Sequence, residues 1–409
     1  MKRILIFSLA YTPFVGGAEL AVKEITNRIG TGDYIFDLIT LRFDSKLPKL
    51  ERIGNVNIHR VGFSVDNPKV SDRDIPFMLR LSKILFPITS FLKAQSLNRR
   101  YHYDMIWAMM ANHAGFGALF FKLMNPKVPY LLELQDGNSL EQVRKRQPIL
   151  QILWPLYRLV YMKANAIKAI SKFIENLTRD VGYHGRVEVI PNGVDVVRFS
   201  APIPEQRIHE LKARYGKRMG DIFLFTASRL VLSRGVEDVI RALKYLPLEV
   251  KFLIAGDGED RDKLELIAKE SGVESRVVFA AHVEHKDLPA FFKISDIFVR
   301  PSIIEGMGSA FIEAFAAGIP VVATPVGGIT DFLFDPLRTP GVEQTGVFCN
   351  VRDPESVARA IKRYLDDPQL VATVVKNAKA LVDDKYDWDM IAADTKTKLF
   401  DLLTQVAKK

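Results

Sequence analysis

The stretch that decides the fold runs from Pro301 to Pro320 and reads PSIIEGMGSAFIEAFAAGIP. A short apolar strand, residues 297–299, precedes it, and a second strand, residues 320–323, begins at its end. Between the two strands lie a loop with two glycines and a helix-length segment rich in alanine and phenylalanine. A strand, a glycine loop, a helix and a strand in this order predict one unit of a parallel α/β sheet.

The loop and the start of the predicted helix have the composition of an anion site. Gly306 and Gly308 allow a ligand to approach the backbone closely. We expect Ser309 to be the N-cap of the helix and Gly318 to end it. The free N–H groups at such a helix start suit a diphosphate.

Two carboxylates accompany this anion site. Glu305 lies in the loop and Glu313 one turn into the helix, so both can face one cleft and accept hydrogen bonds from sugar hydroxyls. The alternative is an acid that only complements the helix dipole. Glu313 is not a capping-box acid, because Ile312 stands three positions after Ser309. The residues alone leave both interpretations open.

Apolar strands separated by helix-length segments extend in both directions from this stretch. In the second half the predicted strands are Ile222–Ala227, Val250–Ala255, Val277–Phe279, Ile297–Val299 and Pro320–Ala323. In the first half they are Arg3–Leu9, Ile35–Leu41, Val56–Val61, Met105–Met109, Val128–Leu134, Ala166–Ser171 and Val187–Ile190. This pattern predicts two Rossmann-like, doubly wound parallel sheets whose strand ends face a cleft.

The chain of 409 residues exceeds one ordinary core, which also favours two domains. We expect an N-terminal domain over 1–195, a C-terminal domain over 196–385, and a final helix within 386–409 that packs back on the first domain. The apolar run after Met1 is expected to be a buried strand rather than a secretion signal. Cys349 is the only cysteine, which favours a reducing, cytoplasmic location and excludes an internal disulfide.

Other candidate ligand contacts follow two buried strands. Arg229 and Arg234 come directly after residues 222–227, and two cations five residues apart can converge on one pyrophosphate. Gly16 and Gly17 follow the first strand and open a helix, although they do not form a dinucleotide-binding fingerprint. The alternatives are two solvated loop arginines and a simple tight turn.

Taken together, these residues resemble the retaining glycosyltransferases of the two-domain GT-B type, a group that includes glycogen synthases, sucrose synthases and bacterial mannosyltransferases. Glu305 and Glu313 match the E-x7-E motif of that group, IPNGVD at 190–195 matches its inter-domain signature, and IAGDG at 254–258 matches a strand-end loop. The resemblance covers nearly the whole chain and is strongest over 187–323.

The resemblance implies roles for several of these residues on the donor side. Arg229 and Arg234 would hold the donor diphosphate, although the family usually has lysine where Arg234 stands. Glu313 would bind the ribose and Glu305 the transferred sugar. Backbone N–H groups of Gly308 and Ser309 would meet the donor, and Gly16 and Gly17 would approach the diphosphate from the other domain.

At the reaction centre the sequence departs from the family pattern. Many relatives carry a histidine after the strand that corresponds to 129–134, whereas this chain has Asp136 just after it. Asp136 could stabilise a forming oxocarbenium or orient the acceptor, or it could only form a turn before Gly137. His113 is a second candidate, with a structural role as its alternative. The resemblance implies retention of anomeric configuration by a metal-independent route, with the nucleotide sugar as a UDP-, GDP- or ADP-linked substrate and no further cofactor.

A basic region lies in the first half of the chain, where we expect the acceptor to bind. Residues 71–170 contain 14 Lys and Arg against 6 Asp and Glu, a balance of +8 within a total of +9. Apolar segments at 77–91 and 149–162 lie among these cations, including Arg144, Lys145 and Arg146. Such a combination suits the headgroup region of an anionic membrane, and we expect a glycan or lipid-linked acceptor. A core-packing helix pair with a solvated basic face is the alternative.

Two other functions remain open from the sequence. A glycoside hydrolase could use Glu305 and Glu313 as its acid and base, but the cationic pair would then have no purpose. A non-catalytic protein that binds nucleotide sugars would show donor binding without transfer. Nucleic-acid binding is the weakest hypothesis, because no recognised module accompanies the basic region.

Overall fold

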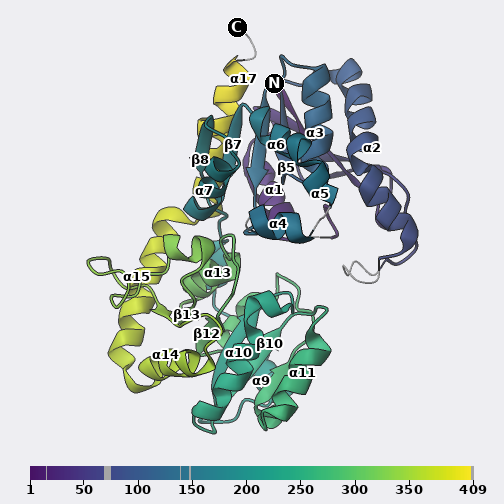
Figure 1. The fold of residues 1–409 in the computed structure, drawn as a ribbon. Helices are drawn as coiled ribbons and strands as arrows, with labels where there is room; N and C mark the ends of the chain where they lie inside the picture. Colours follow the sequence, from purple (N-terminus) through teal and green to yellow (C-terminus); the bar gives the residue numbers. More distant parts are fainter. Residues whose placement is uncertain (15, 69–74, 139, 147–148, 407–409) are drawn as a thin grey trace. The chain divides into compact units, whose positions relative to one another are not determined.

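The computed structural model describes residues 1–14, 16–68, 75–138, 140–146 and 149–406, with the side chains of 144–150 and 406 excepted. These residues form two compact units (Figure 1). Unit 1 comprises Met1–Asn192 and Trp388–Lys409, and unit 2 comprises Gly193–Asp387. Each unit is built on one α/β sheet, which confirms the predicted fold class.

The sheet of unit 1 has eight strands in the order β3-β4-β2-β1-β5-β6-β7-β8. Their bounds are β1 Lys2–Phe7, β2 Tyr34–Leu41, β3 Leu50–Ile53, β4 Val56–Val61, β5 Met105–Met109, β6 Tyr130–Leu134, β7 Ala166–Ala169 and β8 Arg186–Val189. All neighbouring pairs are parallel except β3 and β4, which are antiparallel. The sequence did not predict β3, because this short edge strand has no buried residue to mark it.

The helices of unit 1 cover both faces of this sheet. They are α1 Gly17–Arg28, α2 Phe77–Tyr101, α3 His113–Met124, α4 Leu140–Arg146, α5 Ile149–Ile152, α6 Trp154–Met162, α7 Lys172–Asp180, α16 Trp388–Thr395 and α17 Leu402–Val406. Successive side chains of a strand point to opposite faces. In β1, Ile4 and Ile6 therefore join the core under α1 and α16, whereas Phe7 meets Phe121 of α3 with ring centroids 6.3 Å apart.

The C-terminal segment belongs to unit 1 although it follows unit 2 in the chain. Figure 1 shows it in yellow beside the purple N-terminal part of the chain. A π-helical segment, Lys396–Asp401, joins α16 to α17. Phe400 from this segment packs on Trp107 with ring centroids 5.3 Å apart, and Arg28 Nε of α1 donates to Asp389 at 2.6 Å. Apolar packing and this charged contact thus attach the tail to the first sheet.

Unit 2 has a six-stranded sheet in the order β11-β10-β9-β12-β13-β14, and every neighbouring pair is parallel. The strands are β9 Ile222–Ala227, β10 Val250–Ala255, β11 Val277–Phe279, β12 Ile297–Arg300, β13 Val321–Ala323 and β14 Val347–Phe348. The helices are α8 Val196–Ser200, α9 Glu205–Arg214, α10 Val236–Ala242, α11 Arg261–Glu270, α12 Leu288–Lys293, α13 Ser309–Ala317, α14 Pro354–Asp366 and α15 Pro368–Lys385.

Two kinds of core fill the faces of this second sheet. Aliphatic residues such as Leu224, Ile254 and Val299 pack under α10, α11 and α14. On the other face, aromatic rings dominate: Phe225 and Phe298 meet Phe292 of α12, with centroids 5.1 Å and 5.8 Å away. Phe298 also contacts Phe311 of α13, the helix within the stretch Pro301–Pro320.

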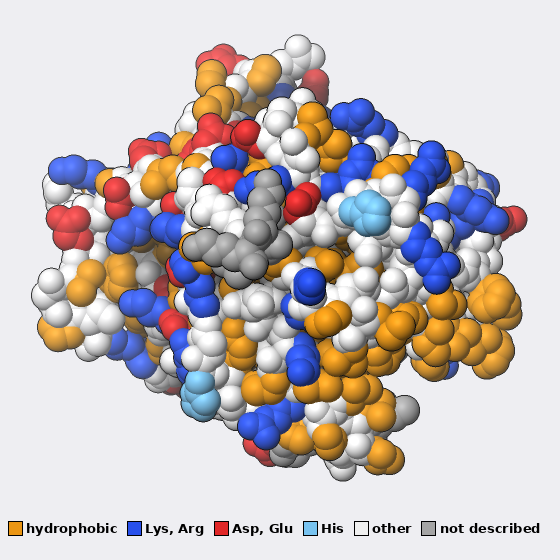
Figure 2. Space-filling view, turned by 90° about the horizontal axis from the view of Figure 1, so that it is seen from above, with side chains coloured by type: hydrophobic (Ala, Val, Ile, Leu, Met, Phe, Trp, Pro, Cys, Tyr) orange, Lys and Arg blue, Asp and Glu red, His pale blue; other side chains and the backbone are white. Residues whose placement is uncertain are grey.

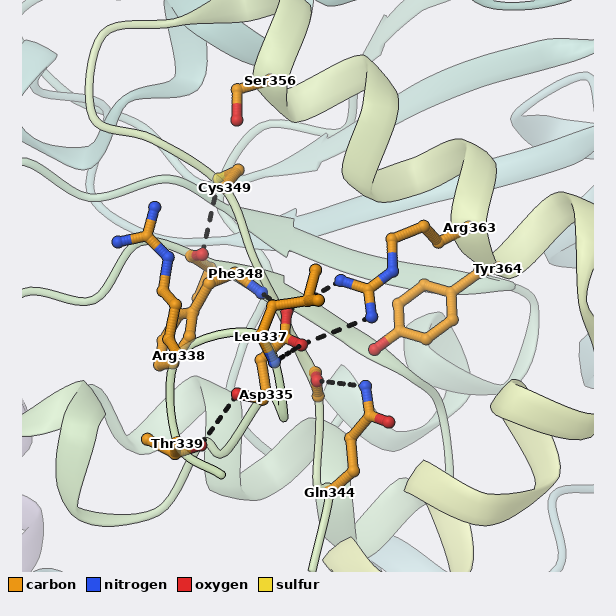
Figure 3. Close-up of polar contacts among 12 residues, drawn as sticks. Asp335, Leu337, Arg338, Thr339, Gln344, Phe348, Cys349, Ser356, Arg363 and Tyr364 are labelled. Atoms are coloured by element: carbon orange, nitrogen blue, oxygen red, sulfur yellow. Dashed lines mark hydrogen bonds and ion pairs between the residues drawn. The ribbon is translucent and has the colours of Figure 1, made fainter. Parts of the chain in front are cut away.

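A buried acid closes the open edge of this sheet. Asp335, 1% exposed, accepts hydrogen bonds from Arg363 of α14 at 2.8 Å and from the backbone N–H of Phe348 in β14 at 2.9 Å (Figure 3). It follows the short helix Gly327–Asp331, which ends the loop after β13. A charge buried among these donors fixes that loop relative to β14 and α14.

No helix within the described part of the chain is long and apolar enough to span a bilayer. Cys349, the single cysteine, is a buried free thiol.

Candidate functional site

The candidate site in unit 2 lies where β12 ends and α13 begins. Gly308, not Ser309, is the N-cap of α13, so the prediction of a serine cap was wrong. Gly308 has φ of +91°, a conformation that favours glycine, and no side chain caps the helix. Gly318 ends the helix with φ of +75°, as predicted. Gly308 has no side chain that could cap the first backbone N–H groups of α13, and such N–H groups suit an anion.

Glu305 lies at the centre of this site and is only 7% exposed. Its Oε2 accepts hydrogen bonds from Arg234 Nη1 at 2.6 Å, Arg300 Nη2 at 3.0 Å and Ser302 Oγ at 3.4 Å. All three bonds go to the same oxygen. Within the described residues, Oε1 is thus the oxygen that remains for a ligand hydroxyl.

Two glycines bring three loops together around Glu305. Gly235, with φ of +69°, follows Arg234, and a Cβ at this position would lie 2.0 Å from the carbonyl oxygen of Pro301. Gly327, with φ of +55°, would place a Cβ 1.7 Å from the carbonyl oxygen of Glu305 itself. A larger residue at either position would separate the loops, so these glycines set the position of the Glu305 backbone.

Arg300 is a site residue that the sequence reasoning missed. It ends β12, is 5% exposed, and stacks its guanidinium 4.2 Å from the ring centroid of Phe311. Burial lowers the pKa of Arg300 to about 10, and the negative charge of Glu305 opposes that shift. Arg300 is therefore still cationic at neutral pH. Its one sequence signal was a charged residue at the end of a buried strand, immediately before the Pro301 loop.

The two arginines that were predicted to converge on one pyrophosphate both lie in the loop after β9. Arg234 ends a 3-10 turn, Leu232–Arg234, and contacts Glu305. Arg229 lies at the start of the same loop and is exposed. The loop after β9 thus supplies one cation bound to the site carboxylate and a second whose side chain is exposed, and their convergence on a pyrophosphate stays a prediction.

Glu313, in the second turn of α13, is 6% exposed. Its Oε1 is 2.8 Å from Nε2 of His285, which lies in the loop between β11 and α12. Nδ1 of the same ring is 3.0 Å from Arg198 Nη2 of α8. The sequence reasoning did not find His285 or Arg198, because each is distant from Glu313 in the chain and neither follows a strand directly.

In unit 1 the glycine loop opens α1 as predicted. Gly16 is the N-cap, and its N–H donates to Oε2 of Glu19 at 2.8 Å. Burial raises the pKa of the Glu19 carboxyl. A Cβ on Gly17 would meet no atom within 4 Å. The turn is therefore closed by its own acid, and only Gly16 is sterically restricted there.

Asp136 and His113 follow the adjacent parallel strands β6 and β5. Asp136 is exposed, and its Oδ1 accepts from the backbone N–H of Asn138 at 3.1 Å, which is the turn-forming contact of the alternative interpretation. His113 is the first residue of α3, and burial, followed by the charge of Lys83, lowers its pKa. Its Nδ1 is buried without a hydrogen-bond partner in the described structure.

Behind Asp136 lies a fully buried ion pair that the sequence did not indicate. Lys168 Nζ is 2.9 Å from Glu133 Oε1, and both side chains are 0% exposed. Gln135 donates to the same oxygen at 2.6 Å and exchanges two amide hydrogen bonds with Asn192. This network fixes the segment that leads to Asp136, because a buried charge is tolerated only when its partners are held in place.

Across the described residues, no three or more His, Cys, Asp or Glu side chains group as metal ligands. The arginines, the helix N–H groups and the two carboxylates of the described site suit the binding of an anion and of hydroxyl groups.

Comparison with known proteins gives two adjacent family matches. Residues 207–381 match the model described as "Glycosyl transferases group 1", and residues 15–198 match "Glycosyltransferase Family 4". An uncharacterized glycosyltransferase of Methanocaldococcus jannaschii is 27% identical over 404 residues, which are 96% of this chain and 96% of that protein.

Two further matches extend the comparison. A GDP-mannose-dependent alpha-(1-6)-phosphatidylinositol monomannoside mannosyltransferase of Mycobacterium tuberculosis is 30% identical over 61% of this chain and 65% of its own length. The solved structure of a sucrose-phosphate synthase from Thermosynechococcus elongatus superimposes with a TM-score of 0.81 at 20% identity, over 99% of this chain and 100% of that one. The chain therefore belongs to the group 1 glycosyltransferases and has their GT-B fold.

Proposed function

We propose that the protein is a retaining glycosyltransferase that moves a sugar from a nucleotide-sugar donor to a glycan or lipid-linked acceptor, without a metal ion. The observation that carries the proposal is the state of the two carboxylates in unit 2. Glu305 and Glu313 each have one oxygen bound by cationic or ring N–H groups of the protein, and each keeps the other oxygen for a ligand. Carboxylates held in this way are suited to accept hydrogen bonds from sugar hydroxyls.

The donor would bind with its diphosphate at the start of α13. Backbone N–H groups of Gly308 and Ser309 and the guanidinium of Arg229 would hold the phosphates, while Arg234 and Arg300 keep Glu305 in place. Glu305 would accept from the transferred sugar and Glu313 from the ribose. Gly16 and Gly17 of unit 1 remain predicted contacts of the same diphosphate.

The chemical step asks the enzyme to stabilise a departing diphosphate and to position the acceptor. Fixed cations and helix N–H groups can stabilise that charge without a metal, because they need no reorganisation during the reaction. Asp136 or His113 would act on the acceptor side, and retention would follow from attack on the face that the diphosphate leaves. The hydrolase alternative loses support, since Glu305 already accepts from two arginines.

A specific surface supports a membrane-borne acceptor. The 25-residue helix α2 buries one face and exposes another, on which Phe77, Ile84, Ile88 and Leu92 are 75%, 68%, 51% and 59% exposed. Figure 2 shows hydrophobic side chains gathered at the lower right, on the side where α2 lies in Figure 1, with Lys and Arg around them. The predicted cations Arg144, Lys145 and Arg146 lie outside the described side chains. An apolar stripe bordered by cations fits an anionic lipid surface, and a cytoplasmic setting is part of the proposal.

The donor site is tested by three substitutions. Glu313→Ala and Arg229→Ala should each weaken donor binding by about 10-fold, because each removes a charge-assisted hydrogen bond worth about 1.5–3 kcal/mol. Asp136→Ala should leave donor affinity unchanged and lower the rate of transfer. Titration calorimetry with the donor and a transfer assay measure both effects. Normal donor affinity in both of the first two variants would contradict the site assignment.

A further inference from the structure

The loop that carries His285 is fixed at the edge of the donor site in unit 2. Its first residues cross the end of β10, where the N–H of Gly256 donates to the carbonyl of Ala281 at 2.7 Å. Farther along, the ring of His285 packs against Phe199 of α8 with centroids 5.7 Å apart. The imidazole is thus held from one side by an aromatic ring, and its two nitrogens face Glu313 and Arg198.

The two partners of His285 decide where its proton lies. A guanidinium group has only N–H donors and no acceptor, so the ring nitrogen that faces Arg198 must accept. Nδ1, which is 3.0 Å from Arg198 Nη2, therefore carries no hydrogen. The proton of the neutral ring is then on Nε2, from which it donates to Glu313 Oε1 at 2.8 Å.

Arg198 lies in the first turn of α8, and its Nε is 3.9 Å from Asp195 Oδ2. Its backbone N–H donates to Asp195 Oδ1 at 3.0 Å, where Asp195 is the N-cap of α8. Its guanidinium lies 5.2 Å from the ring centroid of Phe199. The chain of contacts from Asp195 through Arg198 and His285 to Glu313 lies wholly within unit 2.

We propose that His285 is a positioning residue for Glu313, and that Arg198 acts through His285 by fixing its tautomer. With Oε1 of Glu313 held by Nε2–H, the carboxylate presents Oε2 in one orientation to the ribose hydroxyls of the donor. The inference rests on the proposed role of Glu313 in binding ribose. A ligand whose ribose lacks the donating hydroxyl should bind equally well whether or not His285 orients Glu313. A variant that fails to fold would instead lose the binding of both ligands.

The test is a cycle that combines protein variants with ligand variants. Whichever of UDP, GDP and ADP binds the wild-type protein most tightly in titration calorimetry is compared with its 2′-deoxy and 3′-deoxy analogues. In the wild-type protein, removing the hydroxyl that Glu313 accepts should weaken binding about 10-fold, as the loss of a hydrogen bond to a charged group does. If neither analogue binds more weakly, the ribose role of Glu313 is wrong, and the proposal for His285 falls with it.

In His285→Leu the parent nucleotide should bind about 10-fold more weakly, while the analogue binds as it does to the wild-type protein. The penalty for the missing hydroxyl should thus nearly vanish. His285→Gln keeps an N–H near the place of Nε2 and should restore most of the penalty. His282→Leu, an exposed histidine three residues earlier in the same loop, is the matched control and should behave as wild type.

Arg198 is tested by its dependence on His285. Arg198→Met should reduce the penalty for the missing hydroxyl. The double variant with His285→Leu should bind the parent nucleotide no more weakly than His285→Leu alone, because the effects of two substitutions that act through one contact are not additive. A full hydroxyl penalty that persists in His285→Leu, next to a clear penalty in the wild-type protein, would overturn the positioning role and leave the ribose role of Glu313 intact.

Discussion

The carboxylates of unit 2 differ from one another in what holds them. Glu305 is bound by two guanidinium groups, and one of them, that of Arg300, is buried. Glu313 is bound by the imidazole of His285, whose other ring nitrogen lies 3.0 Å from Arg198 Nη2. Two guanidinium groups therefore contact Glu305 directly, where the transferred sugar is proposed to lie, whereas Arg198 reaches Glu313 only through His285.

A buried acid in α10 gives a pH-dependent prediction. Asp238, in the first turn of α10, is 5% exposed, and Oδ2 has no hydrogen-bond partner in the described part of the chain. Burial first, and then the charge of Glu237, raises its pKa to about 6. Because this folded-state pKa lies above the unfolded value, the stability that Asp238 contributes when protonated is lost as the pH rises through 6.

Asp238→Asn should therefore stabilise the protein by about 1–3 kcal/mol more at pH 7.5 than at pH 4.5. Thermal unfolding at the two pH values measures the difference. Asp262→Asn, an exposed acid in the first turn of α11, is the control, and its effect is subtracted. Equal effects of Asp238→Asn at both pH values would show that burial does not raise this pKa.

At the scale of elements, α2 has two faces with different partners. Leu79, Phe86 and Leu97 are buried on the inner face, and α2 packs along α3 as Figure 1 shows. The outer face repeats apolar residues at 77, 84, 88 and 92, which is helical spacing. An apolar stripe on a long surface helix is costly in water unless a partner covers it, and the proposed partner is an anionic membrane.

Flotation with vesicles tests this assignment. The wild-type protein should float with vesicles rich in phosphatidylglycerol at low salt, bind less at high salt, and bind little to neutral phosphatidylcholine. Ile84→Asp with Ile88→Asp should reduce binding at least about 10-fold, because each isoleucine contributes roughly 1.5–3 kcal/mol when buried. Leu248→Asp, at an exposed apolar residue in unit 2, is the control. Binding that is absent, or equal for neutral vesicles, would contradict the proposal.

The sequence predicted those helices and strands that are marked by turn residues and by a regular spacing of apolar residues. The strand, glycine loop and helix around Gly308 are marked by turn residues and apolar periodicity, so both sheets and α13 could be predicted. The strands β3 and β14 could not be predicted. The four residues of β3 are all exposed or half-buried, and β14 has only two residues, so neither strand shows an apolar periodicity.

Side-chain partners depend on contacts that the linear sequence does not contain. Arg300, His285 and the Glu133–Lys168 pair were missed, since each becomes a site or network residue only when distant loops meet. Ser309 was misassigned as the N-cap for a related reason. The αL conformation of Gly308 ends the loop one residue earlier than composition suggests. Asp136 illustrates the converse, because its turn contact with Asn138 is local and was foreseen as an alternative.

At the scale of the whole molecule, two sheets of similar design carry different chemistry. Unit 2 holds the arginines, the start of α13 and the two carboxylates, whereas Asp136, His113 and α2 belong to unit 1. The family matches divide the chain in the same way, with one model over 15–198 and another over 207–381. The central claim is therefore that unit 2 binds a nucleotide-sugar donor through its own cations.

Titration of the full-length protein with UDP-, GDP- and ADP-linked hexoses tests this claim most directly, in buffer with EDTA and again with Mg²⁺. We predict that at least one donor binds and stabilises the protein, by about 2.7 kcal/mol at 100 times its dissociation constant. Its dissociation constant should agree within about two-fold between the two buffers, because arginines and helix N–H groups neutralise the diphosphate. Failure of all three donors to bind, or binding that requires Mg²⁺, would contradict the account.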